Sequence, residues 1–166
     1  MKGENKMALS RTGYKGAIQT RPQSQVPVCN GLQIQNNKIN NINFDTIQVP
    51  DVLEYLQHNP KFSLYPGACI ALLHKIGKLT NKITINSAEI DRIINDLPDN
   101  FKNREIGNAM YGLQNLDGAD DTTKRLVQAL AEKVATSPAG LNAQAIGNAM
   151  YGLQNLDGAD DTTKRL

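Results

Sequence analysis

The chain has 166 residues, with 18 basic and 16 acidic side chains and a formal net charge of +2. Only 5% of the residues are aromatic and none is tryptophan, so a folded core must consist mainly of small aliphatic side chains. No apolar run approaches the roughly 18 residues of a membrane-spanning helix, and we therefore expect no membrane span.

The first 48 residues differ in composition from the rest. They contain six basic and two acidic residues and are rich in Asn, Gln, Ser and Gly, notably over residues 36–41. Such a segment buries too little apolar surface to offset its chain entropy. We therefore expect a disordered, basic, Asn/Gln-rich tail over residues 1–48. The remainder, residues 49–166, carries the other 12 basic and 14 acidic residues, a net charge of −2.

Two identical stretches dominate this remainder. Residues 106–126 and residues 146–166 both read IGNAMYGLQNLDGADDTTKRL, at an offset of 40 residues, and a diverged copy begins 37 residues before the first, at Cys69. Periods in this range are typical of two-helix repeats. The expected fold is therefore all-α: a short helical-hairpin repeat array (α-solenoid). Its units lie at about residues 63–100, 101–138 and 139–166, and the last unit is incomplete.

Apolar residues recur at helical spacing along the chain. They predict a helix near residues 51–58, helix pairs at 63–79 with 88–97 and at 103–116 with 121–135, and a further first helix at 143–156. Gly107 and Gly112 each weaken the helix by about 1 kcal/mol relative to Ala. We interpret them as points where a neighbouring helix backbone comes close. Asp120 and Asp121 are expected to cap the second helix.

A second set of positions lies on the far side of the first helices from their apolar stripe. These candidate binding residues are Asn108, Tyr111, Asn115, Asn148, Tyr151 and Asn155. On RNA, the amides would bind base edges and the tyrosines would stack on bases. On a protein, the same rows form a polar and aromatic contact surface. A third interpretation is that they pack between neighbouring first helices. Possible phosphate or edge contacts are Lys124, Arg125, Lys164 and Arg165.

No catalytic or metal-binding pattern occurs. His74 occupies the position of Tyr111 and Tyr151 and has no recognisable partner for acid–base work. The acidic residues at 117–121 lack the spacing of a calcium loop, and Cys69 fits a buried hydrophobic position better than a nucleophile. Phosphate-loop, dinucleotide and zinc motifs are also missing. We therefore expect no enzyme, no cofactor and no metal.

Residues 144–156, which read QAIGNAMYGLQNL, resemble the first-helix motif of octotricopeptide and heptatricopeptide repeats. Those are the α-solenoid repeats of organellar RNA-processing proteins of the RAP type, and the resemblance implies helix pairing and RNA binding. The motif IGNAMYGLQ within this segment is more similar still to a bacterial helical repeat family of unknown function. Tyr111 and Tyr151 stand where the organellar motif has Trp.

These patterns favour a non-enzymatic protein–protein binding module, because the repeat region is slightly acidic. An RNA-binding repeat protein is the alternative. The last unit lacks a second helix, so its apolar stripe is expected to be uncovered, which predicts either a truncated copy of a longer array or self-association through the C-terminal end. Reduced thiols at Cys29 and Cys69 suit a cytoplasmic location, with secretion into a host cell as the alternative.

Overall fold

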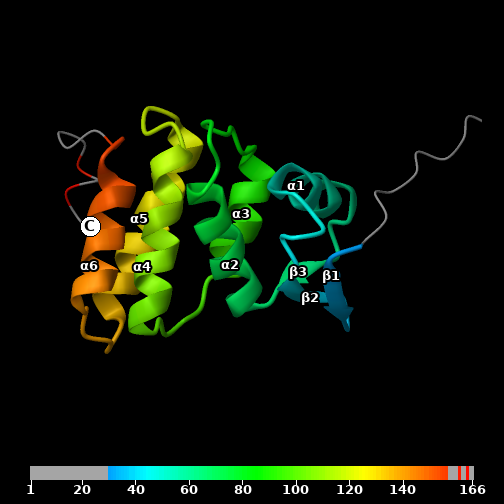
Figure 1. Cartoon of the computed structure of the whole chain (residues 1–166), viewed down its shortest axis with the longest axis horizontal. Coiled ribbons are helices and arrows are strands. Elements are labelled where there is room, and N and C mark those ends of the chain that lie inside the picture. Colours follow the sequence, from blue (N-terminus) through cyan, green and yellow to red (C-terminus); the bar gives the residue numbers. More distant parts are fainter. Residues whose placement is uncertain (1–29, 157–160, 162–163, 165–166) are drawn as a thin grey trace, which may run out of the picture.

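The computed structural model describes residues 30–156, 161 and 164, and that part of the chain is rich in helix (Figure 1). Its elements in chain order are β1 (Leu32–Gln35), β2 (Lys38–Ile42), α1 (Val49–His58), β3 (Ser63–Leu64), α2 (Pro66–Gly77), α3 (Ser87–Asn95), α4 (Asn103–Tyr111), the 3₁₀ helix η1 (Gly112–Asn115), α5 (Asp121–Thr136) and α6 (Ala143–Leu153). The helix-rich character is confirmed. The expectation of an all-α fold is wrong, because the three strands form a small sheet.

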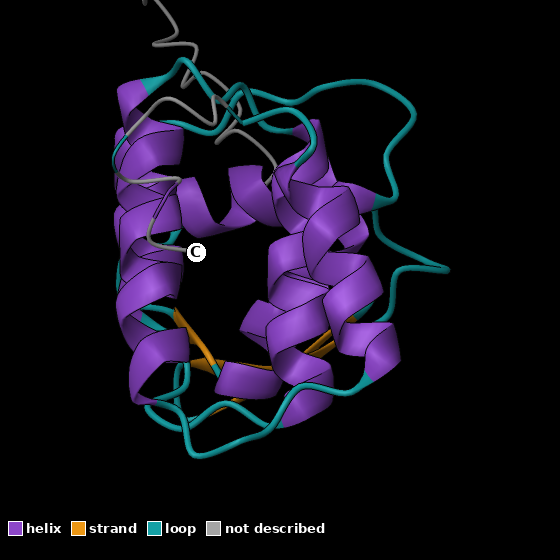
Figure 2. Cartoon of the chain, turned by 90° about the vertical axis from the view of Figure 1, so that its left-hand side faces the viewer, coloured by secondary structure: helices purple, strands orange, loops and turns teal. Residues whose placement is uncertain are grey.

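The helices form two layers. Helices α2, α4 and α6 pack side by side in one layer, and α3 packs against α5 in the other. We call these the first-helix layer and the second-helix layer. A view along the long axis shows them as two columns, with strands visible between the columns (Figure 2). The sheet and α1 lie at one end of the molecule and α6 lies at the other.

Residues 30–48 correct the expectation of a disordered tail that reaches residue 48. Strands β1 and β2 pair antiparallel, with Gln35 opposite Lys38. The two residues between them, Asn36 and Asn37, have φ angles of 50° and 59°. Positive φ at both positions is the requirement of a type I′ hairpin turn, and asparagine tolerates it better than most residues. The remaining part of the expected tail, residues 1–29, lies outside the described residues.

The third strand corrects the expected start of the first repeat helix at residue 63. Ser63 and Leu64 pair with β2 in parallel, and the Tyr65 N–H donates to the Ile39 carbonyl oxygen at 2.8 Å. The helix begins only at Pro66. The helical region is disfavoured for a residue before proline, and Tyr65 is extended, with φ −67° and ψ 146°.

The predicted apolar register of the helices is confirmed. Within α4 and η1 the side chains of Ile106, Ala109, Met110 and Leu113 are all at most 3% exposed. Asp120 is the N-cap of α5, and its side chain accepts a hydrogen bond from the Thr122 N–H. The first helix of this unit is shorter than expected, because α4 ends at Tyr111 and the chain tightens into η1.

Arg92 of α3 and Asp96, the C-cap residue of α3, connect the sheet and α1 to the helical layers. The Arg92 guanidinium donates to the carbonyl oxygens of Leu56, in the last turn of α1, and Asn59, its C-cap residue, at 2.6 and 3.2 Å. The Asp96 carboxylate accepts from the Leu64 N–H of β3 at 2.6 Å. Burial raises the pKa of the Asp96 carboxyl above its usual value. One continuous apolar cluster therefore extends from Ile39 in the sheet to Ala149 in α6.

Candidate functional site

Glycines set the separation of the first helices. A Cβ atom on Gly112 would overlap the Leu73 carbonyl of α2, and one on Gly152 would overlap the Met110 carbonyl of α4. A Cβ on Gly107 would lie 2.8 Å from the Cα atom of Ala145. Backbones therefore meet at both interfaces of this layer, as the sequence predicted for Gly107 and Gly112.

An aromatic row crosses the same layer. The His74 and Tyr111 rings meet edge to face, with centroids 5.4 Å apart. The Tyr111 and Tyr151 rings stack, with centroids 5.6 Å apart and planes 14° from parallel. The two tyrosines therefore contact one another between neighbouring helices, and Tyr151, at 52% exposure, is the open end of the row.

Two of the asparagines serve the packing of the layer. The Asn115 amide donates to the carbonyl oxygens of Ile76, Gly77 and Leu79, at 3.0, 3.1 and 2.7 Å. The Asn155 amide donates to the Gln114 carbonyl at 2.6 Å. Each amide thus donates to carbonyl groups at or just beyond the end of the preceding first helix, where the last carbonyls lack partners in the next helical turn.

The other two asparagines, Asn108 and Asn148, lie together on the surface. They line a hollow of about 140 Å³ between α4 and α6. Its other lining residues are Arg104, Asn142, Gln144 and Ala145. The hollow brings amide groups and one guanidinium together, and it is large enough for a few water molecules or a small polar group.

Positive charge gathers near the start of the aromatic row. The pKa of His74 is lowered, first by its burial and then by the nearby cations Lys78, Arg104 and Lys75. The imidazole is therefore neutral over a wider pH range than a free histidine. Positive potential is therefore concentrated at this end of the row. Lys75 also lies over the Phe44 ring, with its Nζ 5.5 Å from the ring centroid.

The basic candidates that the structure describes have acidic partners elsewhere. Arg125 lies on α5, where it donates to the Ser87 hydroxyl at 2.8 Å and forms an ion pair with Asp91 of α3. Lys124 pairs with Asp121 at 3.8 Å on the same helix. Lys164 is exposed and lies 3.2 Å from Asp161. The fourth candidate, Arg165, lies outside the described residues.

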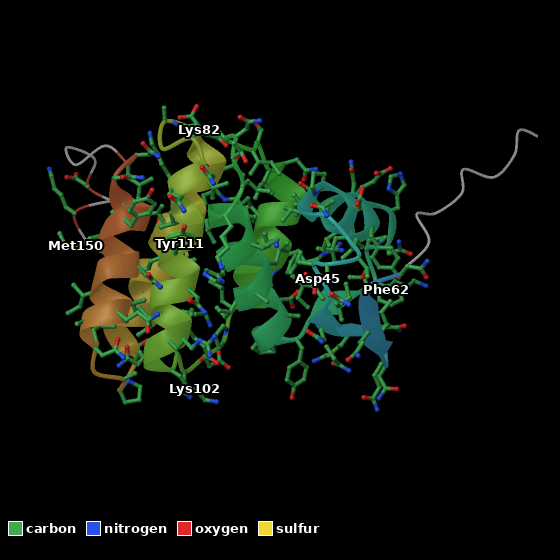
Figure 3. All side chains as sticks on the ribbon, in the orientation of Figure 1. Asp45, Phe62, Lys82, Lys102, Tyr111 and Met150 are labelled. Atoms are coloured by element: carbon green, nitrogen blue, oxygen red, sulfur yellow. The ribbon has the colours of Figure 1, made fainter. Side chains whose placement is uncertain are left out.

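The outward side of α6 is exposed. We use the name α6 end face for Ile146, Gly147, Met150 and Tyr151. Ile146 is 44% and Met150 69% exposed, whereas their sequence equivalents in α4, Ile106 and Met110, are 1% and 3% exposed. No atom of the described residues lies within 4 Å of a Cβ built on Gly147. In Figure 3, Met150 lies at the edge of the molecule and Tyr111 lies inside the stack. Identical residues are thus covered in α4 and open in α6.

Other chemistry is sparse. Cys69 is fully buried, and that burial raises the pKa of its thiol far above the ordinary value, so the thiolate nucleophile does not form. A surface hollow of about 990 Å³ lies beside the hairpin, and among the described residues that line it Asp45 alone is ionisable. Across the described part of the chain, no helix combines the length and apolar character needed to cross a membrane.

The uncovered apolar stripe expected for the last unit is found only in part: Ile146 and Met150 are exposed, whereas Ala149 is 7% exposed and Leu153 and Leu156 pack partly buried against the core. The different contacts of the four asparagines were not predicted from the sequence. All four occupy equivalent far-side positions, and only the three-dimensional stack separates Asn115 and Asn155 from Asn108 and Asn148. The sequence predicts that His74 is a repeat position without a catalytic role. It does occupy that position, and it also begins the aromatic row.

Comparison with known proteins gives no match: no family model, no curated protein and no solved structure matches this chain.

Proposed function

We propose that this chain is a non-enzymatic helical repeat module that binds another protein by accepting one of its helices on the α6 end face. The observation that carries the proposal is the contrast between Met110 and Met150. The same residue in the same sequence is 3% exposed where a helix covers it and 69% exposed where none does.

The exposed groups are suited to a helix partner. Exposed clusters of large apolar side chains mark interaction sites, and a helix laid against an apolar surface is a recurring mode of protein recognition. Leu141, two residues before α6, is also 44% exposed. The outer face of a helical repeat stack is normally polar, so large apolar side chains exposed on such a face are a candidate contact surface.

RNA binding is the second candidate, and a specific observation favours it. The charges of Lys78, Arg104 and Lys75 lie near enough to His74, at one end of the aromatic row, to lower its pKa. Single-stranded nucleic acid is bound by cationic tracks combined with aromatic rings. The stacking of Tyr111 on Tyr151 leaves less ring surface free for bases, and this makes the protein partner the stronger proposal.

A site-specific crosslink tests the proposal. A photoreactive phenylalanine replaces Met150, and a control chain carries it at Gln128, an exposed residue of α5. After illumination in cell extract, we expect a protein adduct that forms at position 150 alone, is resistant to nuclease, maps to a helical segment, and is lost when Ile146→Glu is added. A nuclease-sensitive adduct would support RNA instead. No adduct specific to position 150 contradicts the proposal.

A further inference from the structure

The two interfaces within the first-helix layer share one arrangement. In each, the arriving helix supplies an aromatic ring, the next residue is a glycine, and an asparagine follows three residues later. These residues are Tyr111, Gly112 and Asn115 where α4 and η1 meet α2, and Tyr151, Gly152 and Asn155 where α6 meets α4.

The receiving helix contributes equivalent groups each time. An aromatic ring receives the tyrosine, a carbonyl on the residue before that ring faces the glycine, and carbonyl oxygens near the end of the helix accept from the asparagine. On α2 the ring is His74 and the facing carbonyl is that of Leu73; on α4 they are Tyr111 and Met110. The arrangement thus occurs twice with different receiving side chains, so it rests on geometry shared by the helices.

We propose that the α6 end face is a third receiving site of this kind, and that its occupant is a helix of another protein carrying the pattern Tyr-Gly-x-x-Asn. This inference rests on the proposed function and specifies its partner. The ring of Tyr151 receives the partner tyrosine, the Met150 carbonyl faces the partner glycine, and the Gln154 carbonyl accepts from the partner asparagine. Tyr151 and Met150 are 52% and 69% exposed and therefore accessible.

Gly147 fixes the register of the partner helix. Its equivalent in α4, Gly107, would place a Cβ 2.8 Å from the Cα atom of Ala145. The helix that arrives on α6 therefore carries a small residue six positions before its tyrosine, as Ala145 precedes Tyr151.

The site also selects against charge. Helix α6 reads AQAIGNAMYGL and contains no charged residue. A partner helix that brought a lysine or glutamate into the contact would lose hydration of that charge without an opposite charge to replace it. The contacting face of the partner helix therefore carries small, uncharged side chains and one aromatic ring. The face of α6 that packs on α4 has the same composition.

A peptide with the sequence of residues 141–156 contains this whole pattern and serves as the probe. We expect the labelled peptide to bind the whole chain saturably, with a Kd below about 1 mM by fluorescence anisotropy. Gly147→Leu in the chain should weaken binding about tenfold or more, because the new side chain occupies the space of the arriving backbone. Gly67→Leu is the matched control, since Gly67 also has open space around it but lies on α2.

The alternatives give different results. If the peptide displaces α6 and binds α4, the Gly147→Leu chain binds it as well as the wild type does, and the proposal is overturned. A peptide with Gly152→Leu should bind about tenfold more weakly or not at all, and equal binding by this variant also overturns the pattern. Failure of the peptide to bind, with a helical protein adduct still formed at position 150, refutes the partner sequence and leaves the proposed function standing.

Discussion

Glycine has two opposite roles at the residue scale in this chain, although the local sequence is the same. Gly107 lies against the backbone of α6, and Gly147 faces open space. In both places the residue costs helix stability relative to one with a side chain. Only at Gly107 does the close approach of another helix compensate for that cost.

This difference predicts opposite effects of one substitution. Gly107→Leu should lower the free energy of unfolding by about 1 to 3 kcal/mol, because the side chain has no room beside Ala145. Gly147→Leu should raise it by up to about 1 kcal/mol, because leucine has the better helix propensity and meets no obstacle. Urea denaturation followed by circular dichroism measures both. Shifts of the same sign in the two variants would show that α4 and α6 do not make this backbone contact.

The same residues show which structural features can be predicted from the sequence and which cannot. Periodicity identified the buried stripe of α4 and the close approach at Gly107, because both depend on one helix and its repeat. It left open whether Tyr111 and Asn115 bind a ligand or pack. The answer depends on which carbonyl groups of the preceding helix lie within hydrogen-bond distance. The spacing of residues along the sequence does not predict those distances.

At the scale of elements, the β1–β2 hairpin was the main feature that the sequence did not predict. Its asparagines are abundant in disordered segments, so composition favoured a tail. In the structure Asn36 and Asn37 are turn residues with positive φ, and the strands beside them bury Ile39 and Ile42 at 0% and 6% exposure. The buried isoleucines and the parallel pairing with β3 hold this segment on the core although its average composition is polar.

The turn can be tested with a matched pair. Asn37→Gly should keep or slightly increase stability, since glycine adopts positive φ freely and Asn-Gly is the preferred type I′ sequence. Asn37→Val should lower the free energy of unfolding by about 1 to 2 kcal/mol, the approximate cost of a left-handed conformation for a residue with a side chain. Thermal denaturation of both variants provides the measurement. Equal melting temperatures would rule out a left-handed residue at position 37.

At the scale of the whole molecule, the helices differ in how much of their surface is packed against other elements. Helix α2 packs against the sheet, α1, α4 and η1, and four of its residues, Cys69, Leu72, Leu73 and Ile76, are fully buried. Helix α6 packs mainly on α4 and η1, and its other side is the exposed α6 end face. Its contact with α4 is therefore the principal restraint on its position.

This asymmetry predicts an order of local opening. Amide hydrogens of α6 should exchange with solvent fastest among the six helices and those of α2 slowest, because local opening is easiest where few apolar contacts are lost. Hydrogen exchange with mass spectrometry, read on peptides that cover each helix, measures the order. Gly107→Leu serves as the control, since loosening the α4–α6 contact should speed exchange in α6 while leaving α2 nearly unchanged. If α6 is protected as strongly as α2 in the isolated chain, the end face is already covered, and both the docking proposal and the uneven stability fail together.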